Sequence, residues 1–234
     1  MRLTSFPVRP AAMLCALALC SSTAGAASPL AALSNQDASN GLKAALEAGS
    51  AAAVSKLGVE NGFLSNDKVK IKLPGILEQA KPLLKMTGRG QQLDDLVVSM
   101  NRAAESAVPM AKPLLLDAVK SMSVTDAKNI LSGGDTSVTD FFRQKTSAPL
   151  AVKFLPIVKS VTDRSGLASK YNSTMSQIGK TGLVPQQQST VEGYVTDRAL
   201  DGLYLMIGEE EKAIRSNPLE YGSKIIGKVF GSLK

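Results

Sequence analysis

Three polar side chains at helical spacing, Asn101, Arg102 and Glu105, are candidates for a ligand or partner site. Asn101 and Glu105 are four residues apart and Arg102 and Glu105 are three apart, so one helix face would present an amide, a guanidinium and a carboxylate. Their neighbours include small and apolar residues, which predicts partial burial. Two interpretations follow: a structural ion pair that locks the helix to its neighbours, or a polar anchor inside a ligand cleft.

Two carboxylates, Asp197 and Asp201, lie four residues apart on a second predicted helix, with Arg198 between them. Such a pair can hold Ca²⁺ or Mg²⁺ or act as acid and base. Two carboxylates are too few for a calcium cage and no EF-hand pattern is present, so we favour a solvated or salt-bridged face and predict no metal site. An enzyme would bring two or more of Glu105, Asp197, Asp201 and Tyr204 into one cleft with perturbed pKa values.

A third candidate is the stretch 67–74, in which Lys68, Lys70 and Lys72 alternate with apolar residues. This alternation predicts an extended segment with one cationic and one apolar face. The segment is either a connector laid on the protein body with its lysines in solvent, or an edge that binds a partner. In the second case it would pair with another copy in a homodimer, or meet an acidic lipid or polymer.

Composition excludes several chemistries. The 234-residue chain has no His, no Trp and only two Cys, so it has no Ser-His-Asp or Cys-His nucleophile system and no imidazole metal ligand. Its formal net charge of +7 suits acidic partners, but the basic residues are scattered and aromatic residues make up 4%. We therefore predict no nucleic-acid partner and no cofactor. The acidic run at 209–211 spreads around a helix and is expected to be solvated.

Residues 1–26 have the pattern of a signal peptide: two Arg, a short apolar run and the small residues Ala24-Gly25-Ala26 before a cleavage point. We predict export to the periplasm with cleavage after Ala26. Lipoprotein anchoring is disfavoured because Leu precedes both Cys15 and Cys20. Cleavage would leave residues 27–234 as a single disulfide-free domain with a net charge of +5.

Residues 27–234 otherwise show helical periodicity, which predicts an all-α, compact multi-helix bundle with the one extended segment. The first helix is expected over 35–57, and further helices follow Gly75 and the break at 88–90. Helix starts are predicted from capping pairs: Ser123 with Asp126, Ser137 with Asp140, and Ser189 with Glu192. The basic amphipathic stretch 219–234 either packs on the bundle or rests on an anionic membrane surface.

Three stretches in order resemble one bacterial family: Asn66-Asp67-Lys68-Val69-Lys70-Ile71-Lys72-Leu73-Pro74, Ser99-Met100-Asn101-Arg102-Ala103-Ala104-Glu105, and the region from Asp201-Gly202-Leu203-Tyr204 to Arg215. The sequence is similar to the family called domain of unknown function 4197 from about Leu33 to Phe230. The resemblance implies an exported, mainly helical protein of Gram-negative bacteria. It carries over no catalytic or binding residue.

The function that these features favour is a non-enzymatic, exported binding or interaction module for an envelope protein partner or an apolar ligand. The alternative is an envelope hydrolase that uses carboxylate, Lys or Tyr chemistry. A carrier would show an apolar pocket, and an enzyme would show a cleft with convergent carboxylates.

Overall fold

Helices make up nearly all of the regular structure in the computed structural model, which describes residues 35–134, 136–164, 166–179 and 190–217. The elements in chain order are α1 (Asn35–Leu57), α2 (Gly75–Met86), α3 (Gly90–Ala107), the 3₁₀ turn η2 (Val108–Met110), α4 (Ala111–Lys120), α5 (Val124–Ser132), α6 (Ser137–Thr162), α7 (Gly166–Gly179) and α8 (Val191–Ser216). No strand occurs among these residues. The predicted all-α bundle is confirmed.

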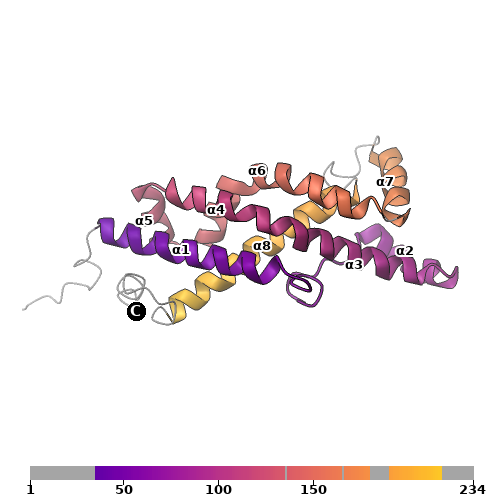
Figure 1. The fold of residues 1–234 in the computed structure, drawn as a ribbon, viewed down its shortest axis with the longest axis horizontal. Coiled ribbons are helices and arrows are strands. Elements are labelled where there is room, and N and C mark those ends of the chain that lie inside the picture. Colours follow the sequence, from indigo (N-terminus) through magenta and orange to yellow (C-terminus); the bar gives the residue numbers. More distant parts are fainter. Residues whose placement is uncertain (1–34, 135, 165, 180–189, 218–234) are drawn as a thin grey trace, which may run out of the picture.

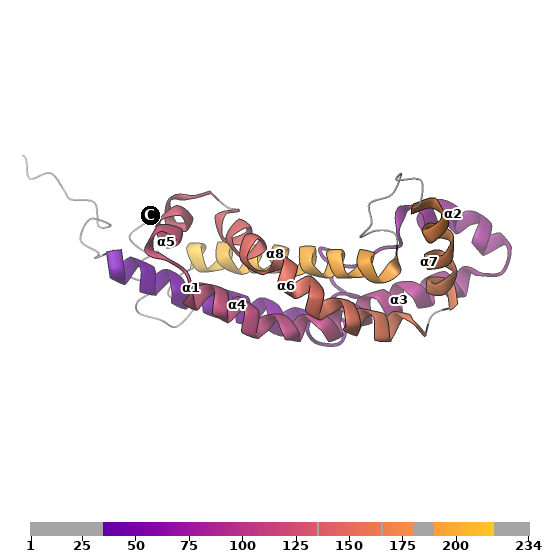
Figure 2. The ribbon, with the colours of Figure 1, turned by 90° about the horizontal axis from the view of Figure 1, so that it is seen from above.

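The long helices run along one axis of an elongated molecule (Figures 1 and 2). Helix α6 packs against α8 and α3, and α1 packs against α8 and α4. Helices α2 and α7 lie at one end of the molecule and α5 lies at the other (Figure 2). The core between the long helices contains fully buried large side chains, among them Phe142, Phe154, Leu96, Leu115 and Tyr204.

Local sequence signals fix several helix ends. Ser123 accepts a hydrogen bond from the Asp126 N–H and Asp126 accepts one from the Ser123 N–H, so the predicted capping box is confirmed. Helix α2 ends before Gly88, whose φ of 75° is accessible to glycine without strain. The Gly88 N–H donates to the Lys85 carbonyl, which closes the last turn.

Two of the predicted caps need correction. The residue before α6 is Thr136, and the Ser137 hydroxyl donates to the carbonyls of Ile130 and Gly134 instead of capping the helix. Ser189 lies outside the described residues. The start of α8 is capped by Thr190, whose hydroxyl accepts the Gly193 N–H at 3.0 Å.

Two prolines lie inside α6 without ending it. Pro149 and Pro156 are both exposed, so the backbone N–H groups that proline lacks are missing from the solvent side of the helix. In the described part of the chain, no helix has the length and apolar content needed to cross a membrane. The predicted signal peptide at 1–26 and the amphipathic stretch 219–234 lie outside the described residues.

Candidate functional site

The lysine-alternating segment has the predicted burial pattern, but it is not a strand. Residues 67–69 form a turn and residues 70–74 have no regular secondary structure. The Asn66 carbonyl accepts hydrogen bonds from the N–H groups of Val69 and Lys70, which explains the turn. Val69, Ile71 and Leu73 are buried, whereas Lys68, Lys70 and Lys72 are exposed. The alternation of side chains therefore holds even where the backbone departs from the extended form.

The side chain of Asn101 forms with this segment the backbone hydrogen bonds that a neighbouring strand would form. Its Oδ1 accepts the Ile71 N–H at 2.9 Å, and its Nδ2 donates to the Ile71 carbonyl at 2.9 Å and to the Val97 carbonyl at 2.7 Å. Asn101 is fully buried. A buried backbone N–H and C=O both need partners, and one side-chain amide can satisfy them together.

Glu105 and Arg102 hold the preceding loop on α3. Glu105 Oε1 accepts the N–H groups of Phe63 and Leu64 at 3.0 and 3.1 Å, and its Oε2 accepts from Arg102 Nη1 at 2.6 Å. Arg102 also donates to Glu60 and Asn61. The side chains of Asn101, Arg102 and Glu105 thus fix residues 60–71 to α3, and all of these bonds are made within the protein.

The other side of the segment lies against α8. A Cβ at Gly202 would be 2.8 Å from Phe63 Cε1 and 3.2 Å from Val69 Cβ, so only glycine allows the loop to approach this closely. The Tyr194 hydroxyl donates to the Lys72 carbonyl at 3.1 Å. Residues 63–72 are therefore held between α3 and α8.

A groove of about 270 Å³ runs between this segment and α8. We call it the basic groove. It is lined by Lys68, Val69, Lys70, Ile71, Lys72, Tyr194, Arg198, Asp201, Gly202 and Leu205. Four of these side chains are cations and one is a carboxylate, so the lining carries a clear excess of positive charge.

The cations of the basic groove differ in their partners. Lys68 is paired with Glu209, and this hydrogen bond lowers the pKa of the Glu209 carboxyl. Arg198 forms an ion pair with Asp201 at 3.3 Å, and its guanidinium lies 5.8 Å from the centre of the Tyr194 ring. Within the described part of the chain, no carboxylate forms an ion pair with Lys70 or Lys72. These two lysines can pair with an incoming anion without breaking an existing ion pair.

The three remaining candidates do not converge with Glu105. Asp201 lies in the basic groove and is paired with Arg143 at 3.0 Å as well as with Arg198. Burial, together with the negative charge of Asp201, raises the pKa of Asp197. Tyr204 is fully buried, its hydroxyl lies 2.9 Å from that of Thr146, and burial raises its pKa. Tyr204 therefore has no access to a substrate in the groove.

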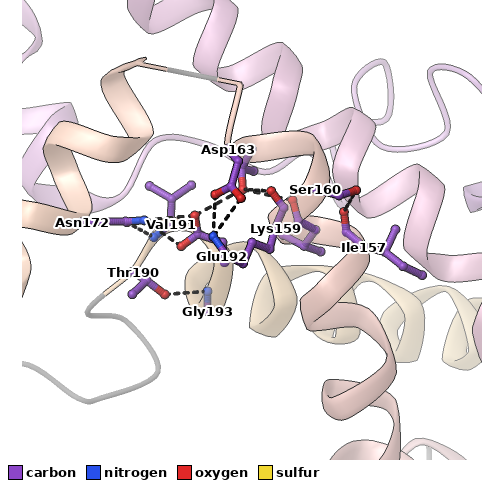
Figure 3. A network of polar contacts seen from close by, with 11 residues as sticks. Ile157, Lys159, Ser160, Asp163, Asn172, Thr190, Val191, Glu192 and Gly193 are labelled. Atoms are coloured by element: carbon purple, nitrogen blue, oxygen red, sulfur yellow. Dashed lines mark hydrogen bonds and ion pairs between the residues drawn. The ribbon is translucent and has the colours of Figure 1, made fainter.

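The hydrogen-bond network around the buried carboxylate of Glu192 was not predicted from the sequence. Both oxygens of Glu192 accept hydrogen bonds from Asn172 Nδ2, at 3.0 and 2.8 Å, and Asn172 Oδ1 accepts the Val191 N–H. Next to it, Lys159 is paired with Asp163 at the end of α6 (Figure 3). Glu192 was expected to serve a capping box, but it instead joins α7 to the start of α8. The only sequence signal for this was a carboxylate in the first turn of a helix.

The expectation of a solvated acidic run at 209–211 is wrong for two of its members. Glu210 and Glu211 are 3% and 5% exposed, and Glu210 forms an ion pair with Lys56 on α1. Three successive helical residues span more than half of the circumference, so at least one must face the body of the protein. Among the described residues, no group of three or more carboxylates, Cys or His is placed to hold a metal ion.

Comparison with known proteins agrees with the resemblance seen in the sequence. Neither the curated proteins nor the solved structures gave a match. A family model described as "Protein of unknown function (DUF4197)" matches residues 32–231, which is most of the chain. The chain belongs to this family.

Proposed function

We propose that this protein is a non-catalytic binding module of the bacterial cell envelope that takes an acidic segment of a partner protein in the basic groove. The observation that carries the proposal is the pair Lys70 and Lys72, which are exposed and without an ion pair to any described residue, on a backbone fixed from both sides. Fixed cations lose little conformational freedom of the backbone when they bind, which favours association.

The geometry supports an acidic partner over an apolar ligand. The apolar cavity between α1 and α8, lined by residues such as Leu42, Leu46 and Ile207, has a volume of about 10 Å³. This is about the space of one water molecule, far below the hundreds of Å³ that small-molecule sites enclose. The basic groove is larger and open, but its charges suit carboxylates better than hydrocarbon.

Strand pairing with a second copy through 67–74 receives less support than side-chain recognition. The N–H and C=O of Ile71 are bonded to Asn101, the N–H of Lys70 is bonded to Asn66, and the C=O of Lys72 accepts from Tyr194. A further strand would need these same groups. The lysine side chains remain the accessible feature.

A hydrolase receives no support from the arrangement of Glu105, Asp197, Asp201 and Tyr204. Glu105 is bound to the backbone N–H groups of the loop on α3, Tyr204 is buried, and Asp201 is held between two arginines. A general acid and base must both reach the same substrate. No described cleft presents two of these groups with an altered pKa.

The binding test uses a fluorescein-labelled poly-glutamate peptide and fluorescence anisotropy at low and physiological salt. Exposed ion pairs contribute about 0.5 kcal/mol each, so the triple variant Lys70→Gln, Lys72→Gln, Arg198→Gln should bind roughly tenfold more weakly. The affinity of the wild-type protein should fall as salt is raised, because exposed charges are screened.

The matched control removes the same net charge elsewhere. Lys112, Lys128 and Lys153 are exposed on α4, α5 and α6, and their triple Gln variant should change the affinity by less than about twofold. Equal losses in the two variants would show that only net charge matters and would refute the groove. Absence of wild-type binding at low salt would refute the acidic partner.

Location in the envelope rests on the signal pattern in residues 1–26. Expression of the full sequence with a C-terminal tag, followed by fractionation and N-terminal sequencing, tests it. We expect the periplasmic fraction to contain a chain that begins at Ala27. A full-length chain confined to the cytoplasm would contradict the proposed location without affecting the groove.

A further inference from the structure

Helix α2 has apolar side chains on two sides, and only one side is covered. Leu77 is buried and Leu84 packs against the core beside it, whereas Ile76, Leu83 and Met86 are 46%, 65% and 86% exposed. Ile76, Gln79, Leu83 and Met86 are spaced three or four residues apart along the helix. These four residues form one continuous, uncharged stripe, which we call the α2 stripe.

The α2 stripe lies at an extremity of the molecule. Helix α2 packs on α3 and lies at the end opposite α5 (Figures 1 and 2). A single exposed apolar side chain is common on protein surfaces, but a continuous helical stripe of them marks a contact surface.

Positive charge is present on the remaining surface of α2 and just after it. Lys81 and Lys85 lie one turn apart on the side of α2 away from the stripe, and Arg89 follows the helix. The acidic residue of α2, Glu78, is paired with Lys81 at 3.2 Å. Lys85 and Arg89 are exposed and have no ion pair with any residue that the structure describes.

We infer that the α2 end of the protein is a contact surface for an anionic phospholipid bilayer. Ile76, Leu83 and Met86 enter the boundary between headgroups and acyl chains, and Lys85 and Arg89 contact lipid phosphates. An uncharged apolar face with cations on the other side of the helix is the pattern of helices that lie in a membrane interface. The basic groove is a separate feature, so either proposal can fail without the other.

The size of the stripe argues for a lipid surface over a second copy of the chain. A helix of 12 residues is about 18 Å long, and one face of it offers far less than the roughly 800 Å² per partner of a stable protein interface. A bilayer needs no matching partner surface, and attraction to anionic headgroups adds to the apolar contact.

Co-sedimentation with vesicles tests the inference. Protein expressed from the full sequence is mixed with vesicles of phosphatidylethanolamine and phosphatidylglycerol, or of phosphatidylcholine alone. Leu83→Ser with Met86→Ser should weaken binding to the anionic vesicles by about tenfold or more, because two large apolar side chains no longer enter the interface. Lys85→Gln with Arg89→Gln should weaken it several-fold, and binding to phosphatidylcholine should be weaker throughout.

Matched controls carry the same changes elsewhere. Val124→Ser with Val152→Ser removes apolar side chains that are 45% and 74% exposed on α5 and α6 and should leave binding unchanged. All variants are expressed with the same residues at both ends of the chain, so a contribution from those stretches is common to all of them. If the Leu83 and Met86 variant binds the vesicles as strongly as the wild-type protein, the inference is overturned. Any affinity for the vesicles would then come from other parts of the chain.

A spectroscopic readout is independent of affinity. The chain has no Trp, so Met86→Trp introduces a single reporter and Val152→Trp its control. A blue shift of the indole emission of the Met86→Trp variant on anionic vesicles, with none for the Val152→Trp variant, would support insertion of the stripe. Equal emission from the two variants would overturn it, as would a vesicle-independent doubling of molecular mass that the Leu83 and Met86 changes abolish.

Discussion

Asn101→Leu changes a fully buried amide to an apolar side chain of similar volume. In the wild-type protein the amide bonds both the N–H and the C=O of Ile71. In the variant both groups are buried without a partner, and each such group costs about 1–3 kcal/mol. The added apolar burial of Leu offsets about 1 kcal/mol. We expect the free energy of unfolding to fall by about 3 kcal/mol and the melting temperature to fall by roughly 6–12 °C.

Urea denaturation followed by far-UV circular dichroism measures the change, and hydrogen exchange locates it. The Ile71 amide should be protected in the wild-type protein and should exchange faster in the variant, while amides in the middle of α6 change only with global stability. Gln92→Leu is the control, since Gln92 is an exposed amide on the same helix and its change should stay within about 0.5 kcal/mol. Equal stability of the two variants, or a protected Ile71 amide in Asn101→Leu, would refute the reasoning.

Three further changes test other contacts. Gly202→Ala places a methyl group 2.8 Å from an aromatic ring and should lower the urea-unfolding free energy by about 1–3 kcal/mol, whereas Gly75→Ala meets no atom within 4 Å and should not. Asp197→Asn should stabilise the protein at pH 7, because burial raises the pKa of Asp197 above its usual 3.8 and disfavours its charged form. The gain should vanish as the pH falls toward 3.8. The control Asp94→Asn changes an exposed surface residue and should alter the stability at pH 7 by no more than about 0.5 kcal/mol. Tyr204→Phe should cost about 1 kcal/mol at pH 7 for the lost hydroxyl contact. Because burial raises the Tyr204 pKa above 10.0, the wild-type protein should lose stability above pH 10 and the Phe variant should lose less, which thermal melts from neutral to strongly alkaline pH would measure.

Helices could be predicted from the sequence where their signals are local. The span of α1, Asn35–Leu57, was expected from apolar spacing and the stop at Gly58, and the box of Ser123 and Asp126 depends on residues three apart. The cap predicted at Ser137 was wrong because a serine at this spacing can also donate its hydroxyl to carbonyls of the preceding turn. No local sequence feature decides whether the hydroxyl caps the helix or makes these other bonds.

Pairings between distant residues could not be predicted. Lys68 and Lys70 are equivalent in the sequence pattern, yet Glu209, which is 141 positions away, pairs with Lys68. Glu210 is buried because α8 presents that face to Lys56 on α1. The sequence predicted that the lysines were exposed, but only the packing of α8 shows which of them form an ion pair with a described residue.

The candidate site depends on the same contacts as local stability. Asn101 on α3 and Tyr194 on α8 bind the backbone of the segment that carries Lys70 and Lys72, and Glu105 on α3 binds the loop that precedes it. Of these three residues only Tyr194 lines the groove, so the other two act on it through the backbone. Loss of the Asn101 hydrogen bonds should allow the lysine segment to detach from α3. Poly-glutamate binding should then weaken, although the charge of the groove stays the same. A loss of affinity in Asn101→Leu at a temperature where α8 remains folded would show that a fixed backbone, and not charge alone, makes these lysines a binding site.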